Sequence, residues 1–154
     1  MAAVYHGACT SENQYLNKFP YYGDSTDPNT HLRTLQHFGL NAKFITTGSI
    51  DDLKSEIDKG RPTPCGWLHH GTPSAPTGGG HYGCVVGYDP ETESWIVHDP
   101  YGDPNLVSGG WLHYNSIHAG GTVYGQHLRF SYQNWNPRWS VGDSTDGWYM
   151  RIWF

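Results

Sequence analysis

The chain has 154 residues, which is the length of a single domain and enough to bury a hydrophobic core without disulfides. Charged residues make up only 15% and aromatic residues another 15%, and 20 glycines and 10 prolines favour strands and loops over a helical bundle. The nine basic residues are scattered among 14 acidic ones, with a net charge of −5, so we do not expect a nucleic-acid partner.

The sequence shows no signal peptide, no membrane span and no cysteine motif. The first residues lack the basic and apolar regions of a signal peptide, and no apolar run reaches the length of a membrane span. We therefore expect a soluble protein, made in the cytoplasm, without a membrane partner. Cys9, Cys65 and Cys84 show no CxxC spacing, so we expect neither a disulfide framework nor a cysteine-based zinc site, and no cofactor.

The first half of the chain carries three helix signals. Ser11 can cap the first helix, and Asp27 followed by Pro28 is a typical start for the second. Ser49 and Asp52 have the spacing of a capping box, which marks the third. The expected helices are residues 12–19, 28–38 and 50–59, with a strand at 42–46 before the last.

The second half reads as strands separated by Gly, Pro, Asn and Asp clusters. The loop at 71–80 is too long for a tight turn, and such loops usually border sites. Helices first and an antiparallel sheet afterwards indicate an α+β fold. The expected strands are residues 64–68, 81–88, 95–99, 128–132 and 148–153.

Two of these strands, 81–88 and 95–99, are joined by a short turn and should form a hairpin. If Val85 pairs with Val97, Gly83 lies opposite Asp99, and His81 is one diagonal step away on the same face. Because Gly83 has no side chain, the imidazole and the carboxylate have room to meet. The sequence therefore predicts a contact between His81 and Asp99.

A histidine oriented by a buried carboxylate is what a cysteine or serine nucleophile needs as its general base. The same residues also fit a structural interpretation. In it, His81 ends a glycine loop, and Asp99 accepts backbone N–H groups in a turn. Spacing alone leaves both interpretations open.

The segments GRPTPCGWLHHG, GGGHYGCVVGYD and WIVHDPYG, in this order, resemble the C39-like cysteine peptidases of bacterial and phage proteins. The resemblance implies a papain-like α+β fold over residues 1–154, with N-terminal helices packed on an antiparallel β-sheet. It also implies that His81 is the catalytic base and Asp99 its orienting partner.

In that family the catalytic cysteine begins the first helix, where the helix N-terminus lowers its pKa. The opening MAAVYHG resembles a later part of that helix, so the resemblance places the family cysteine before Met1, outside this sequence. Within the sequence, Cys9 is the candidate nucleophile, because it precedes a helix and lies upstream of His81 in the family order. Its alternative role is that of a small buried thiol. Cys84 should face away from His81, and Cys65 is expected to pack in the sheet.

By resemblance, the expected function is hydrolysis of peptide or isopeptide bonds, with bacterial cell-wall peptidoglycan as the substrate. Such an enzyme would act on the cell wall or as part of a phage particle. The sequence does not indicate an oligomeric state.

Two other functions stay open. One is a peptide-binding or cell-wall-binding module that keeps the peptidase fold without a nucleophile. Six aromatic residues could line its surface: Trp67, Tyr82, Trp95, Tyr101, Trp111 and Tyr114. The other is a zinc hydrolase with ligands from His69 or His70, His81 and Asp99, although no ordered ligand spacing accompanies them. Adjacent histidines on a strand point to opposite faces, so at most one of His69 and His70 could take part.

Overall fold

The computed structural model describes residues 1–24, 26–114, 125–142 and 145–154. The helices are α1 (Ala2–Tyr5), α2 (Glu12–Leu16), the 3-10 helix η1 (Phe19–Tyr21), α3 (Pro28–His37), α4 (Ile50–Asp58) and α5 (Tyr132–Trp139). The strands are β1 (Asn41–Gly48), β2 (Thr63–Trp67), β3 (His70–Thr72), β4 (Ala75–Thr77), β5 (His81–Asp89), β6 (Ser94–His98), β7 (Gly102–Pro104), β8 (Trp111–Tyr114), β9 (Leu128–Ser131) and β10 (Gly147–Trp153). None of the helices in these ranges has the length and hydropathy needed to span a bilayer.

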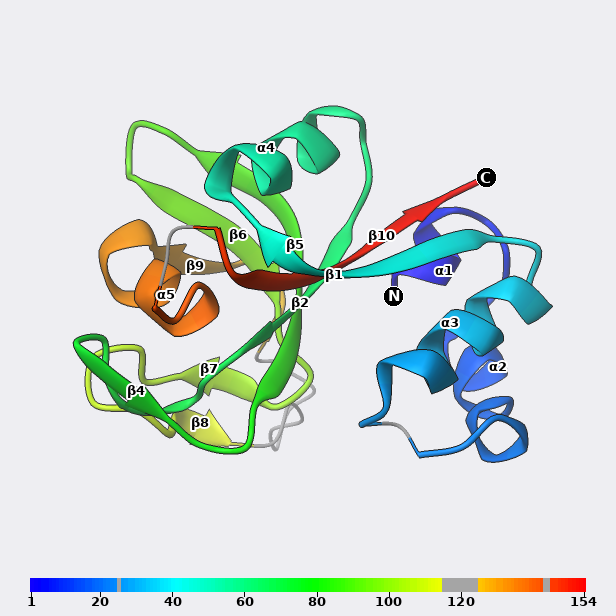
Figure 1. Cartoon of the computed structure of the whole chain (residues 1–154), viewed down its shortest axis with the longest axis horizontal. Coiled ribbons are helices and arrows are strands. Elements are labelled where there is room, and N and C mark those ends of the chain that lie inside the picture. Colours follow the sequence, from blue (N-terminus) through cyan, green and yellow to red (C-terminus); the bar gives the residue numbers. More distant parts are fainter. Residues whose placement is uncertain (25, 115–124, 143–144) are drawn as a thin grey trace, which may run out of the picture.

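The centre of the α+β fold is a six-stranded antiparallel sheet with the order β1-β10-β2-β5-β6-β9 (Figure 1). It contains all five strands predicted for the second half and the predicted strand at 42–46. The strand β10 lies inside the sheet, where Trp153 pairs with Asn41 of β1 and Tyr149 pairs with Cys65 of β2. The last strand in the chain therefore joins β1 to the rest of the sheet.

Both faces of the sheet are covered by helices. On one face α4 and α5 pack against a core that includes Leu53, Val85, Trp95, Trp135 and Tyr149, all at most 1% exposed (Figure 1). On the other face α1 and α3 cover a second cluster, formed by Ala2, Ala3, Cys9, Leu35, Leu40, Met150 and Ile152. Each large apolar side chain buried in this way stabilises the fold by about 1.5–3 kcal/mol. The second core holds the N-terminal helices α1 and α3 on the sheet.

The predicted helix starts are confirmed. The Asp27 side chain accepts a hydrogen bond from the Asn29 N–H at 2.9 Å, and Ser49 and Asp52 form the capping box reciprocally, at 3.1 and 3.0 Å. The end predicted for the first helix is wrong, because α2 stops at Leu16 and a 3-10 turn follows. Beyond Leu16 the backbone tightens, with the Lys18 N–H bonded to the Tyr15 carbonyl at 3.0 Å, and Pro20 has no N–H with which to continue an α-helix.

Two segments in the second half of the chain also differ from the prediction. The loop at 71–80 contains a small hairpin, β3 and β4, rather than irregular chain. The strand predicted to reach Tyr132 instead ends at Ser131, where α5 begins. Pro137 inside α5 obscured that helix, since proline usually interrupts helices, but Trp135 and Trp139 are buried and hold it on the sheet.

Candidate active site

The hairpin of β5 and β6 has the predicted register, with Val85 opposite Val97. A bulge between Val85 and Gly87 shifts the pairing only toward the turn. At the other end of the hairpin, a Cβ atom added to Gly83 would lie 3.2 Å from Val97 Cγ1 and 3.7 Å from Asp99 Oδ2. A side chain at this position would therefore press on Val97 and lie in van der Waals contact with the Asp99 carboxylate.

His81 and Asp99 meet as expected. His81 Nε2 lies 2.9 Å from both Oδ1 and Oδ2 of Asp99, and the pair is almost fully buried, with 8% of the His81 side chain exposed and none of the Asp99 side chain. A carboxylate only accepts hydrogen bonds, so the imidazole proton lies on Nε2. In this tautomer Nδ1 carries the lone pair that can accept a proton.

The backbone around Asp99 holds the carboxylate in place. Asp99 Oδ1 also accepts the N–H of Tyr101 at 2.9 Å, and the N–H of Asp99 donates to the carbonyl of Gly125 at 2.7 Å. Gly125 has a φ of 100°, and a Cβ atom there would overlap the Asp99 carbonyl oxygen. Only glycine can occupy this position without moving the segment that carries Asp99.

Aromatic rings surround the His81 imidazole. Its ring centroid lies 4.8 Å from that of Trp111, 4.9 Å from Tyr101, 5.5 Å from Trp67 and 6.0 Å from His69. These rings exclude water from the bond to Asp99, and a hydrogen bond in such a poorly polarisable environment is electrostatically stronger than in water. The sequence had indicated Trp67, Tyr101 and Trp111 only as possible members of a binding surface.

The three cysteines lie in three different surroundings, all buried. Burial raises the pKa of Cys65 well above its ordinary value and that of Cys84 to about 12, so both are protonated thiols at neutral pH. Cys9 is 5% exposed and packs in the apolar cluster with Ala2 and Leu35, on the face covered by α1 and α3. It is not among the residues whose rings or polar atoms contact His81, and its role as nucleophile stays a prediction.

The adjacent histidines do not behave as predicted. The rings of His69 and His70 lie 4.1 Å apart instead of on opposite faces of a strand, because the chain leaves β2 at Trp67 and begins β3 at His70. Burial, followed by the charges of His70 and His81, lowers the pKa of His69. Among the described residues, no group of three His, Cys, Asp or Glu side chains is arranged to hold a metal ion. The zinc alternative therefore gains no geometric support there.

Arg138 is the structural residue near the site that sequence patterns did not reveal. It is fully buried on α5, and its guanidinium donates to four backbone carbonyls, those of Leu68 at 3.2 Å, His70 at 3.0 Å, Leu106 at 3.0 Å and Gly71. Leu68 lies between β2 and β3, His70 and Gly71 lie in β3, and Leu106 follows β7. Arg138 thereby fixes the segments that border the His81 ring.

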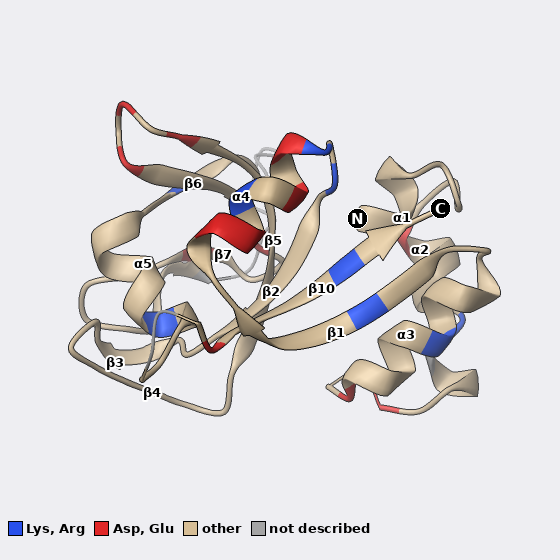
Figure 2. Ribbon diagram, turned by 45° about the horizontal axis from the view of Figure 1, so that its top comes forward, with Lys and Arg blue, Asp and Glu red and all other residues tan. Residues whose placement is uncertain are grey.

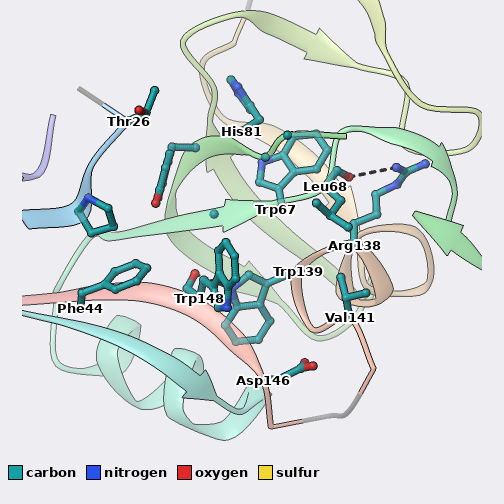
Figure 3. Close-up of a pocket in the computed structure, with 15 residues that line it drawn as sticks. Thr26, Phe44, Trp67, Leu68, His81, Arg138, Trp139, Val141, Asp146 and Trp148 are labelled. Atoms are coloured by element: carbon teal, nitrogen blue, oxygen red, sulfur yellow. Dashed lines mark hydrogen bonds between the residues drawn. The ribbon is translucent and has the colours of Figure 1, made fainter. Parts of the chain in front are cut away.

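Two cavities adjoin the pair. The first, of about 540 Å³, is lined by His81, Trp67 and the glycines before His81, and extends past Phe44 and Trp148 (Figure 3). The second, of about 430 Å³, lies on the face covered by α1, and is lined by Met1, Ala2, Gly83, Cys84 and Asp99 among others. A histidine and carboxylate pair between two cavities has room for a substrate on one side and a nucleophile on the other.

Comparison with known families agrees with this geometry. The model of the Peptidase_C39 like family matches residues 1–114, which include α1, both residues of the pair and most of the sheet. The chain belongs to the Peptidase_C39 like family. No curated protein matches it. Membership in the Peptidase_C39 like family indicates a peptidase-like function, which is the chemistry that an oriented histidine next to a cavity can perform.

The aromatic residues proposed for a binding surface separate into two groups. Trp95 is fully buried in the core and cannot line a surface, and Trp67 is 3% exposed. Tyr101 is 47% exposed, and Tyr82 lines both cavities. The side chain of Tyr114 lies outside the part of the chain that the structure describes.

Proposed function

We propose that the chain is a cysteine peptidase-like hydrolase of peptide or isopeptide bonds, with the helices and sheet arranged as in papain-like enzymes. The observation that carries the proposal is the bond of His81 Nε2 to both carboxylate oxygens of Asp99. This bond leaves Nδ1 as the proton acceptor, in a site shielded by Trp111 and Tyr101.

In the proposed reaction, His81 Nδ1 takes the proton of a thiol, and the thiolate attacks the carbonyl carbon of the substrate. The imidazolium then gives this proton to the leaving amine as the C–N bond breaks, which leaves a thioester. Water, deprotonated by the same histidine, hydrolyses the thioester and restores the thiol. Asp99 keeps Nε2 protonated and stabilises the imidazolium during both steps.

Two sources of the thiol are compatible with this proposal. Cys9 is the source within the chain, and it would need to leave its apolar cluster. The other source is a cysteine before Met1 in a longer protein, as the family resemblance predicts. Met1 and Ala2 line the second cavity together with Gly83 and Asp99, so residues that continue α1 backwards would start next to the pair. We favour this second source, because it needs no rearrangement of the core.

For the substrate we propose cross-linked peptides of the bacterial cell wall, which would place the protein at the wall or in a phage particle. The choice of substrate and location rests on the resemblance to bacterial and phage peptidases.

The test of the hydrolase proposal is fragment release from purified peptidoglycan and from synthetic wall peptides. We expect His81→Ala to abolish release while its far-ultraviolet circular dichroism stays that of the wild type. Release at the wild-type rate by this variant would contradict the assignment of His81 as the base.

The nucleophile can be identified by alkylation at neutral pH followed by peptide mass spectrometry. We expect Cys65 and Cys84 to react slowly in the folded protein, because burial holds both as thiols. If Cys9 is the nucleophile, it should react fast, and Cys9→Ser should abolish fragment release. If the thiol precedes Met1, release should require those residues and should survive Cys9→Ser.

The burial of all three cysteines favours one further candidate function, a binding module with a peptidase fold. The cavity beside His81 would then hold a wall peptide without cleaving it. Such a module should sediment with peptidoglycan and release no fragments, even when the residues before Met1 are present.

A further inference from the structure

The cavity of about 540 Å³ beside His81 has a chemical character that indicates what it holds. It runs from Thr26 and Phe44 on one side, over Trp148, to Val141 and Asp146 on the other (Figure 3). Most of its wall consists of aromatic and aliphatic side chains. Trp148 is 49% exposed although it lies in a central strand, so its ring is available to a bound group. An apolar stem could pack along this wall.

Two carboxylates border the cavity. Asp146 lines it directly, and Asp27 lies near its other end, where burial and then the Asp27 carboxylate raise the pKa of Tyr82. Figure 2 shows acidic residues at the start of α3, where Asp27 caps the helix. Arg138 also lines the cavity, but its guanidinium is fully buried on four backbone carbonyls, and Figure 3 shows it pointing toward Leu68 and away from Asp146.

A hydrogen-bond donor in the wall indicates a second feature of the bound group. Trp67 is 3% exposed, and its indole N–H has no hydrogen-bond partner among the described residues. Figure 3 shows the indole nitrogen on the side of the ring that faces Thr26 and Phe44 across the cavity. A buried donor without a partner costs about 1–3 kcal/mol, which a carbonyl oxygen of a bound peptide would recover.

We propose that this cavity is the subsite for a peptide residue with an alkylammonium side chain, such as lysine, adjacent to the bond that His81 helps to cleave. The stem lies along Trp148, the ammonium group binds Asp146, and a backbone carbonyl accepts from Trp67. Asp146 Oδ1 accepts the Ser140 hydroxyl at 2.8 Å, which helps to hold the carboxylate at this end of the cavity. The position of the scissile bond rests on the proposed function, whereas the binding preference does not.

The experiment measures binding without turnover. Nα-acetyl-lysine methylamide is titrated into the protein, with Nα-acetyl-norleucine methylamide as the matched neutral probe, and the tryptophan indole N–H signals are followed by NMR. We expect the lysine probe to bind about tenfold more tightly and to shift the Trp67 and Trp148 signals, since a charge-assisted hydrogen bond is worth that difference.

Three variants assign the effect to residues. Asp146→Asn should reduce binding of the lysine probe to that of the norleucine probe and leave norleucine binding unchanged, which also reports that the cavity is intact. Trp148→Ala should weaken binding of both probes. The control Glu91→Gln removes an exposed carboxylate in the turn between β5 and β6 and should keep the full preference for lysine.

Equal affinity for the two probes, or a lysine preference that survives Asp146→Asn, would overturn the proposal. Failure of the proposed function has a different signature. In that case the lysine probe still binds selectively, but no peptide is cleaved. Conversely, cleavage of wall peptides without any lysine preference would retain the hydrolase and remove this subsite.

Discussion

Asp99 binds its neighbours through both carboxylate oxygens and its side chain has no exposed surface, so the hydrogen bonds it can make are tightly constrained. One donor is the His81 ring and another is the backbone of Tyr101. An amide at this position would keep the shape but would present an NH₂ group that donates to the ring. The imidazole would then carry its proton on Nδ1, the atom that accepts one in the proposed reaction.

We therefore expect Asp99→Asn to lower kcat/KM for peptide cleavage by roughly 10⁴-fold, with little change in the folded structure. The measurement is steady-state cleavage of a fluorogenic wall peptide, with circular dichroism as the check on folding. The matched control is Asp103→Asn, because Asp103 pairs with His113 at 3.5 Å on the surface. Equal rates for the two variants would show that Asp99 does not orient the base.

At the scale of elements, the small hairpin of β3 and β4 depends on α5. The carbonyls of His70 and Gly71 accept from Arg138, and the backbone at the start of β3 also bridges to Gly109. This anchorage explains why a short two-stranded hairpin, which is marginally stable alone, keeps a fixed place beside His81.

Replacing Arg138 by methionine should therefore free this hairpin. We expect the free energy of unfolding to fall by about 3 kcal/mol, since four buried carbonyls lose a charged donor. Hydrogen exchange should accelerate at residues 69–77 more than in β9. The control is Arg129→Met, whose exposed side chain pairs with Asp89 and should matter little. Unchanged exchange at residues 69–77 would contradict the anchoring role.

The strands of the central sheet and the β5–β6 hairpin could be predicted from the sequence. Continuous apolar runs predicted the strands, and the register of Val85 with Val97 predicted the meeting of His81 and Asp99, because a hairpin is a local structure. Arg138 and Gly125 could not be predicted, since their partners are backbone atoms of loops distant in sequence. The close stacking of His69 on His70 likewise depends on where β2 ends, which periodicity does not specify.

For the whole molecule, half-buried histidines make stability depend on pH. The pKa values of His6, His69 and His98 are lowered from 6.5, chiefly by burial. The unfolded chain then binds protons more readily than the folded one, so stability is complete above about pH 6.5 and is lost as the pH falls toward the folded-state values. Carboxylates whose pKa is lowered in the folded protein lose their contribution to stability only at lower pH, near 4.

Urea unfolding should show this dependence directly. We expect the midpoint to be nearly constant between pH 8 and 7 and to fall at pH 5.5. His98→Gln should flatten the curve, because Nδ1 of His98 is buried without a hydrogen-bond partner among the described residues and its ring lies 4.3 Å from that of His127. His113→Gln, on the surface, should leave the curve unchanged. A midpoint that rises on acidification would contradict this account.

The position of β10 inside the sheet has a consequence for the order in which the molecule folds. The β5–β6 hairpin closes through a short turn, so it can form early, whereas Asn41 and Trp153 must close a loop that includes most of the chain. Pairs so distant in sequence form late. His81 and Asp99 therefore meet before Trp148 arrives on β10, and an intermediate without that strand would have the His81–Asp99 pair in place and would lack the Trp148 wall of the adjoining cavity.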